Sequence, residues 1–306
     1  MVKNNFIVSV ESVKKVYKNN NNLITALDDI NLRIKKGEVF ALIGPNGSGK
    51  TSLIKLLLNF IYPTRGTIFI ENNSVYNRVS RKNLGYVPEE TKYPFNTNVI
   101  SFLKRMSKIN GFESISQNKY ILDLLKKLNL YENQNSICNF SKGMKKRLSI
   151  AYSLLINPKI LLLDEPTDGL DPVERKVIIS IIKEFKENNG TVFLCSHILT
   201  EVEQLCDRFA IIQKGRIIYE GRKEEFNTKG FIVTFINYNS ETLINNFDPK
   251  YQIQYDGIEG KAEVTDENEL STLIALLSHY KIVVKEIKSN NVSLESIYVK
   301  YLKENK

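Results

Sequence analysis

Two kinds of hydrophobic pattern alternate along residues 1–230. Short and nearly continuous apolar runs are typical of strands that are buried on both faces; they are EVFALIG (38–44), KILLL (159–163), TVFLCS (191–196) and RFAIIQ (208–213). Between these runs, apolar residues recur every three or four positions, as in amphipathic helices. Buried strands that alternate with helices predict an α/β fold with a largely parallel sheet.

The first 40 residues follow a looser alternation. FIVSVESVKKVY (6–17) and ITALDDINLRI (24–34) flank the polar tract Asn19–Asn22. Two alternating runs on either side of a short polar tract are typical of a hairpin. We therefore expect antiparallel strands at the N-terminus. A second hairpin is predicted to begin near Arg208, with GRIIYEG (215–221) as its second arm.

Helical spacing is clearest in two regions. Residues 97–130 predict two helices within a helical subdomain at about 90–150; their apolar positions are Val99, Phe102, Leu103 and Met106, then Ile121, Leu124, Leu125 and Leu128 after a stop at Gly111. A later helix begins with Asp171 as N-cap, Pro172 in its first turn and Glu174 completing a capping box. Its apolar stripe comprises Val173, Val177, Ile178, Ile181, Ile182 and Phe185.

Residues 231–306 predict a separate, small α+β domain. Short strands are expected near 231–236, 251–255 and 261–265, then a helix near 268–279, the strand KIVVKEI (281–287) and a last helix. That last helix has Leu294, Ile297, Tyr298, Tyr301 and Leu302 on one face. The charge supports a boundary near residue 230, because residues 1–230 carry +12 and residues 231–306 carry −3.

The net charge of +9 leaves several partners open. A basic body can bind nucleic acid or face an anionic membrane, and a lysine-rich soluble surface explains the charge equally well. Three cysteines without paired spacing argue against a disulfide framework or a zinc site and fit a reducing cytosol. No apolar run approaches the ~20 residues of a membrane helix, and no signal peptide is evident, so the chain itself is not expected to cross a membrane.

The stretch GPNGSGKT (Gly44–Thr51) fits the pattern GxxxxGK[ST] between a predicted strand and a predicted helix. Backbone N–H groups and a helix N-terminus there form a nest for phosphate oxygens. Lys50 supplies a charge to the β- and γ-phosphates, and Thr51 can bind Mg²⁺. The pattern predicts a site for a nucleoside triphosphate with its magnesium ion.

The run ILLLDEP (160–166) complements this loop. Asp164 ends a predicted buried strand, where a carboxylate can hold Mg²⁺, and Glu165 follows directly. Two carboxylates after four buried aliphatic residues are costly to desolvate. A functional role for this pair therefore explains the pattern better than an ordinary acidic turn.

Five motifs occur in one order: Gly44–Thr51, FSKGM (140–144), LLLDEP (161–166), GLDP (169–172) and SH (196–197). Their order and spacing across residues 1–230 resemble the ATP-binding subunit of an ABC transporter, a P-loop NTPase. FSKGM, the loop glutamate Glu89 and the C-terminal SLESIYVKYL resemble the subfamily that drives ABC-2 exporters.

The resemblance implies a role for each matching residue. The ATP-binding residues would be Tyr17, Gly44, Pro45, Asn46, Gly47, Ser48, Gly49, Lys50, Thr51 and Ser52; Glu165 would be the catalytic base and His197 would donate to the γ-phosphate; Thr51, Asp164 and Glu89 would hold Mg²⁺; and Ser141, Gly143 and Asp171 would reach ATP bound to a second chain. Tyr17 can also be an ordinary strand aromatic and His197 a structural histidine, which is the role we expect for His279.

Two departures from the family pattern bear on these roles. Glu89 stands where a glutamine is common, and it can still bind Mg²⁺; the neighbouring Glu90 could be aligned there instead, leaving Glu89 as a solvated acid. Lys142 and Met144 replace a glycine and a glutamine, whereas Ser141 and Gly143 are kept. Activity is therefore expected to survive.

Met144, Leu148, Ala151 and Leu155 are expected to anchor the helix that follows Ser141 to the core. Lys145, Lys146 and Arg147 would then lie on or beside its outer face, in solvent. The anion that binds at this helix N-terminus would be a γ-phosphate rather than a nucleic-acid backbone.

The resemblance implies ATP-driven export through a separate transmembrane permease subunit. The chain would act in the cytoplasm, peripheral to the membrane, as a homodimer or as a heterodimer with a second ABC ATPase, and no nucleic-acid partner is expected. The alternative is a soluble ABC-type ATPase acting on ribosomes or nucleic acid, although such proteins usually carry two cassettes or a long insertion. Residues 231–306 would regulate the protein or stabilise its dimer, or form a packing appendage.

Overall fold

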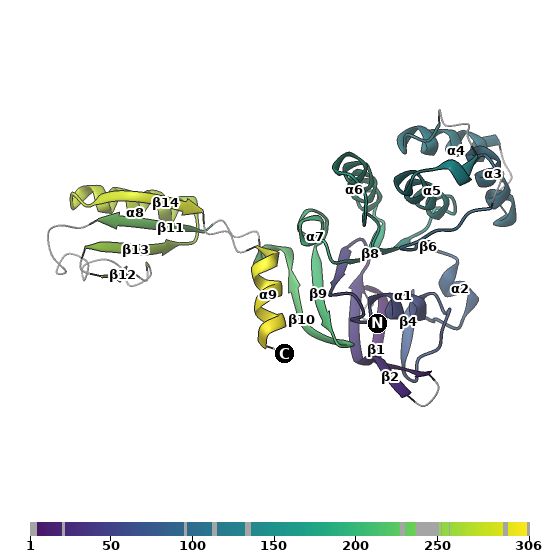
Figure 1. Cartoon of the computed structure of the whole chain (residues 1–306), viewed down its shortest axis with the longest axis horizontal. Helices are drawn as coiled ribbons and strands as arrows, with labels where there is room; N and C mark the ends of the chain where they lie inside the picture. The colour runs from purple at the N-terminus through teal and green to yellow at the C-terminus, as the bar shows by residue number, and fades with distance from the viewer. Residues whose placement is uncertain are drawn as a thin grey trace. The chain divides into compact units, whose positions relative to one another are not determined.

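The computed structural model describes residues 5–19, 22–94, 97–111, 115–131, 136–226, 230–236, 251, 253–256, 258–289 and 293–304. It divides into two compact units, residues 1–221 and 222–306 (Figure 1). The division follows Gly221, whereas the sequence predicts a domain boundary after Gly230. Among the described residues, no helix combines the length and the apolar character that a membrane span requires.

A six-stranded sheet forms the centre of the first unit. Its order is β10-β9-β3-β8-β7-β6, made of β10 (Arg216–Arg222), β9 (Arg208–Gln213), β3 (Val39–Ile43), β8 (Thr191–Ser196), β7 (Ile160–Asp164) and β6 (Leu84–Val87). β3 pairs in parallel with β8 and β9, and β7 pairs in parallel with β8 and β6. Every residue of β3, β7 and β8 is buried, as their continuous apolar sequences predict. The predicted α/β fold is confirmed.

A second, antiparallel sheet has the order β2-β1-β4-β5, with β1 (Phe6–Asn19), β2 (Asn22–Lys35), β4 (Arg65–Ile70) and β5 (Asn73–Ser74). Asn19 pairs with Asn22 at the end of the β1–β2 hairpin, which confirms the predicted hairpin; residues 20 and 21 of its turn lie outside the described residues. The short helix α1 (Lys50–Leu57) shares one hydrophobic core with both sheets. This core fixes the loop that precedes α1.

The helices α3 (Val99–Ile109), α4 (Ile115–Lys127) and α5 (Lys142–Leu154) gather on one side of the first unit (Figure 1). The two predicted helices of residues 97–130 are thereby confirmed, and Gly111 follows the first of them. The shorter elements of this region are α2 (Arg78–Arg81) and the 3₁₀ turn η1 (Ile137–Asn139).

Helix α6 (Pro172–Glu187) begins where the sequence predicts and is followed by β8 and α7 (Leu199–Leu205). The Asp171 carboxylate caps α6 by accepting bonds from the N–H groups of Val173 and Glu174, at 2.9 and 2.8 Å. Val173 is 72% exposed, so its predicted place in the apolar stripe is wrong. Position 173 therefore belongs to the surface at the start of the helix. The side chain of the next residue, Glu174, pairs with Arg147 at 3.2 Å.

The second unit has its own sheet, in the order β12-β13-β11-β14, and its own core. Its elements are η2 (Lys223–Glu225), β11 (Phe231–Ile236), β12 (Gln254–Tyr255), β13 (Glu259–Val264), α8 (Glu267–His279), β14 (Val283–Ser289) and α9 (Leu294–Glu304). Buried Val233, Phe235, Ala262, Leu273 and Leu277 join the sheet to α8. These elements make an α+β unit, and part of the strand predicted near 251–255 lies outside the described residues.

Candidate functional site

The loop Gly44–Thr51 joins β3 to α1 at the carboxyl edge of the parallel sheet. Gly47 and Gly49 have φ angles of 79° and 112°, a region that disfavours side chains. A Cβ atom at Gly49 would lie 2.6 Å from the carbonyl oxygen of Ala26, whereas one at Gly47 would meet nothing within 4 Å. The backbone at Gly47 therefore faces open space, as an anion nest requires.

Lys50, the first residue of α1, is buried beneath this loop. Its Nζ donates to the carbonyl oxygen of Gly44 at 2.6 Å and lies 3.3 Å from Oε1 of Glu165. Pro45 and Asn46 are exposed in the loop, and Ser48 is buried with no hydrogen-bond partner for its Oγ among the described residues. A buried ammonium beside an unpartnered hydroxyl fits the binding of phosphate oxygens.

Asp164 ends β7 directly beneath the loop and is only 1% exposed. Burial raises the pKa of its carboxyl group against the opposing hydrogen bond from Thr51, and the negative charges of Glu165 and Glu89 raise it further. Its Oδ1 has no hydrogen-bond partner among the described residues. A hydroxyl, an unpartnered carboxylate oxygen and a nearby second carboxylate form a donor set that suits Mg²⁺.

Glu165 and His197 come from neighbouring strands and meet at the same edge. Nδ1 of His197 lies 2.9 Å from Oε2 of Glu165, and the His197 backbone N–H donates to the same oxygen at 3.2 Å. The other oxygen of Glu165 faces Lys50. A buried carboxylate between a lysine and a histidine, next to a phosphate nest, can orient or deprotonate a water molecule.

The structure adds Asp168 to these predicted residues. Its carboxylate accepts a bond from the Lys142 ammonium at 3.2 Å, and this bond is the main reason that the pKa of Asp168 is lowered. Its other oxygen lies 4.0 Å from Nε2 of His197. Asp168 therefore lies between His197 and Lys142, the lysine that replaces the usual glycine of the motif. The sequence does not predict this arrangement, because Lys142 and His197 are distant in the chain.

A second unpredicted contact holds the turn after Glu165. The Thr167 hydroxyl donates to the Glu201 carboxylate on α7, and Arg175 lies 3.9 Å from the other oxygen of Glu201. Burial raises the pKa of Glu201, against the bond from Thr167. No sequence pattern indicates this pair, because the burial of Thr167 and Glu201 is visible only in the structure.

The N-terminus of α5 carries the motif FSKGM. Ser141 is exposed and caps the helix, its Oγ accepting a bond from the Met144 N–H at 3.1 Å. Gly143 is buried against Glu174, and a Cβ atom there would lie 2.0 Å from a carboxylate oxygen. The start of α5 is therefore exposed at Ser141 and closely packed at Gly143.

Two basic residues of α5 do not lie on the solvated face that the sequence predicts. Lys146 is 3% exposed, and Arg147 is largely buried; it donates to the Leu128 carbonyl at 3.1 Å and pairs with Glu174. The predicted solvated face is therefore wrong for both residues. The reason is that α5 is buried on two sides, since Gly143, Ser149 and Ser153 allow close packing on the face that Lys146 shares.

Glu89 lies in the exposed turn after β6, and its charge acts on Asp164. Tyr17, on β1, is half-buried; its hydroxyl lies 3.3 Å from Oγ of Ser52 on α1, and the Lys15 ammonium lies 5.0 Å from its ring centre. Tyr17 thus stands beside the first turn of α1. Asp171 uses its Oδ1 to cap α6, as described above.

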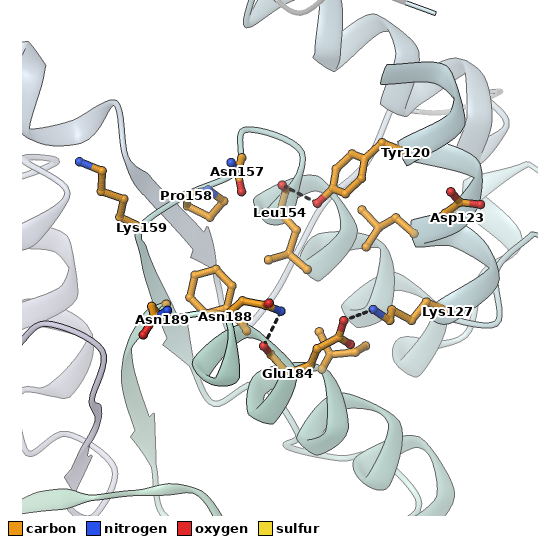
Figure 2. Close-up of a pocket in the computed structure, with 14 residues that line it drawn as sticks. Tyr120, Asp123, Lys127, Leu154, Asn157, Pro158, Lys159, Glu184, Asn188 and Asn189 are labelled. Atoms are coloured by element: carbon orange, nitrogen blue, oxygen red, sulfur yellow. Dashed lines mark hydrogen bonds and ion pairs between the residues drawn. The ribbon is translucent and has the colours of Figure 1, made fainter. Parts of the chain in front are cut away.

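A cavity of about 650 Å³ lies at the opposite edge of the same sheet (Figure 2). Tyr120 donates to the Leu154 carbonyl at 3.1 Å on one side, and Lys127 of α4 pairs with Glu184 of α6 on another. Lys159 precedes β7 and Gly190 precedes β8, so the cavity faces the strand ends farthest from Asp164 and His197. The cavity is therefore separate from the site built around Gly44–Thr51.

The chain matches the family model of the ABC transporter over residues 27–168. It is 39% identical to the lantibiotic transport ATP-binding protein SrtF of Streptococcus pyogenes over 215 residues, which are 70% of this chain and 90% of that relative. The chain belongs to the ABC transporter ATP-binding family. It is also 31% identical to the methionine import ATP-binding protein MetN of Francisella tularensis over 85% of this chain and 82% of that relative.

Solved structures agree with this membership of the ABC family. The dimeric ATP-binding cassette MJ0796 in a post-hydrolysis state with ADP and phosphate has a TM-score of 0.66 and 26% identity, covering 71% of this chain and 98% of that one. An ATP-binding subunit of an ABC transporter has a TM-score of 0.65 and 27% identity, covering 72% and 91%. This ABC protein is an ATPase with the P-loop fold predicted from its sequence.

Proposed function

We propose that this ABC ATPase powers export through a separate membrane-spanning permease of the ABC-2 type, from a position at the cytoplasmic face of the membrane. The motif FSKGM, the glutamate at position 89 and the C-terminal SLESIYVKYL support the exporter assignment. The relatives do not decide the direction, because one is named for lantibiotic transport and another for methionine import. The direction therefore rests on these three sequence features.

One observation carries the proposal. Four polar side chains meet at one edge of the sheet, namely Lys50, Asp164, Glu165 and His197, whereas Ser141 of the same chain is exposed at the N-terminus of α5. In the proposed site, the loop Gly44–Thr51 and Ser52 bind the triphosphate and Tyr17 stacks on adenine. The buried and unpartnered Ser48 hydroxyl supports this assignment.

Thr51, Asp164 and Glu89 would hold Mg²⁺. The hydrogen bond between Thr51 and Asp164 and the free Oδ1 of Asp164 support the first two ligands, and the electrostatic effect of Glu89 on Asp164 supports the third. When bound, the ion would neutralise charge on the phosphate oxygens. Glu165 would take the proton of the attacking water, and His197 would donate to the γ-phosphate.

The second half of each ATP site would come from another copy of the chain or from a second ABC ATPase. Ser141 and Gly143 would contact the γ-phosphate at the N-terminus of α5, where the helix dipole favours an anion. Asp171 would reach across the same interface. ATP binding would close the pair, and hydrolysis would reopen it.

Purification with neighbouring gene products tests the transport assignment. The tagged full-length chain, expressed with its adjacent reading frames and extracted in mild detergent, should retain a hydrophobic multi-span subunit. Its ATPase rate should change when that subunit is present. Ribosomes or RNA in place of a membrane subunit, resistant to high salt, would overturn transport in favour of the alternative function.

A further inference from the structure

Lys146 makes three hydrogen bonds from a buried position on α5. Its Nζ donates to the carbonyl oxygens of Pro88 at 2.9 Å, Glu89 at 2.7 Å and Glu165 at 3.0 Å. An ammonium group has three protons, so these bonds use its whole donor capacity. A long cationic side chain is rarely buried in this way unless its bonds repay the desolvation.

The three bonds join parts of the ATP site that are far apart in sequence. Pro88 and Glu89 follow β6, and Glu165 follows β7. Lys146 lies one turn into α5, the helix whose N-terminus carries Ser141 and Gly143. One side chain of α5 therefore contacts both the turn at Pro88 and Glu89 and the proposed catalytic base. The N-terminus of the same helix is proposed to contact ATP bound to the second chain.

Glu165 needs such support because its backbone is strained. Its φ angle is 46°, in the left-handed region that residues with side chains seldom adopt. On one side its N–H donates to the Cys195 carbonyl at 2.9 Å, and on the other its carbonyl accepts from Lys146. The remaining bond to that carbonyl, from the Asp168 N–H, is longer at 3.4 Å. Strained residues persist where the surroundings hold them.

We propose that Lys146 is a positioning residue for ATP hydrolysis, which holds the peptide carbonyls of Glu89 and Glu165 so that the Glu165 carboxylate points at the γ-phosphate. The inference rests on the proposed role of Glu165 as the base. Lys146 touches no substrate atom and acts through Glu165. It also makes the loop at Glu89 and the base follow any movement of α5.

Three variants of the full-length chain test this role. Lys146→Met keeps an unbranched side chain, one atom shorter, and removes every donor. Lys146→Gln restores N–H donors without the charge, and Lys145→Met is the control at the neighbouring, half-exposed position. Steady-state phosphate release gives kcat and KM for each, and thermal unfolding reports whether each is folded.

A positioning residue lowers kcat and leaves KM nearly unchanged, because ATP binding does not depend on it. We expect Lys146→Met to lose about tenfold or more in kcat with KM within about threefold, and Lys146→Gln to recover kcat to within about threefold of the wild type. Lys145→Met should match the wild type. If Lys146→Met does not fold, Lys146→Gln is compared with the wild type alone. A measurable loss of kcat at unchanged KM would then support the positioning role, and an unchanged kcat would overturn it.

Unchanged kcat in Lys146→Met, equal losses in the methionine and glutamine variants, or an effect on KM alone would each overturn the positioning role. Glu165→Gln in the same assay separates this result from the proposed function. If Glu165→Gln turns over normally, the base assignment has failed. If Glu165→Gln is inactive while Lys146→Met is normal, only the inference about Lys146 has failed.

Discussion

At the scale of single residues, the site is organised around Glu165. One carboxylate oxygen faces the Lys50 ammonium and the other faces Nδ1 of His197, so both oxygens are held by groups that can also bind phosphate. Removing the charge of a buried partner is costly when the other charge remains unpaired. Here Lys50 also donates to the Gly44 carbonyl, which gives it an acceptor when Glu165 is neutral.

Glu165→Gln is therefore expected to fold and to bind ATP, but to hydrolyse it at least about a hundredfold more slowly, because an amide cannot accept the proton of the attacking water. Without turnover, the ATP-bound dimer should persist. Phosphate release measures the rate, and gel filtration with ATP and Mg²⁺ measures the dimer. Hydrolysis at the wild-type rate would show that another group is the base.

At the scale of elements, the sequence predicts strands better than the burial of side chains on helices. β3, β7 and β8 are recognisable because a strand buried on both faces must be continuously apolar. Helix α5 does not show a single apolar stripe, because its second buried face contains Gly143, Lys146, Ser149 and Ser153 beside one large apolar residue, Ile150. The acceptors of Lys146 are carbonyl groups, which any sequence supplies, so no residue pattern could reveal them.

Contacts between elements also include a polar tie between the two sheets of the first unit. Glu71, in the turn between β4 and β5, accepts bonds from Lys159 before β7 and from Asn83 before β6, both at 2.6 Å. Burial alone would raise the pKa of Glu71, but these two bonds outweigh it and hold the pKa below its usual range. The ionised form therefore stabilises the folded chain.

Glu71→Gln should lower the free energy of unfolding by about 1 kcal/mol at pH 7, since it weakens hydrogen bonds to a charged group. A folded-state pKa below that of the unfolded chain contributes stability above the unfolded pKa, and this contribution is lost as the pH falls through the folded pKa. The difference between variant and wild type should thus shrink below pH 4.5, the ordinary pKa of a glutamate side chain.

Urea unfolding of the full-length chain from pH 7 to the acid limit of folding measures this difference. Glu187→Gln, at an exposed glutamate in the last turn of α6, is the matched control and should follow the wild type at every pH. A constant difference for Glu71→Gln across the range would mean that the bonds do not depend on ionisation.

At the scale of the whole molecule, two units with separate cores carry charges of opposite sign. Buried Val233, Phe235 and Leu273 belong to the core of the second unit, whereas the residues of the proposed ATP site all lie in first units. The first unit, residues 1–221, carries +11 and the second unit, residues 222–306, carries −2. The extension therefore lowers the charge that each chain brings to a dimer.

A chain ending at Gly230 should fold and bind ATP with an unchanged KM, because it keeps the loop Gly44–Thr51, Asp164 and the core around α1. Its ATP-dependent dimer should form only at several-fold higher concentration, because two bodies of +12 repel more strongly than two chains of +9. Raising the salt should reduce the difference in dimerisation between the truncated and the full-length chain, since the Debye length falls from about 10 Å at 0.1 M to about 3 Å at 1 M.

Sedimentation velocity with ATP at both salt concentrations measures this difference. Equal dimerisation of the two chains at low salt, with equal ATPase rates, would instead identify residues 231–306 as a packing appendage.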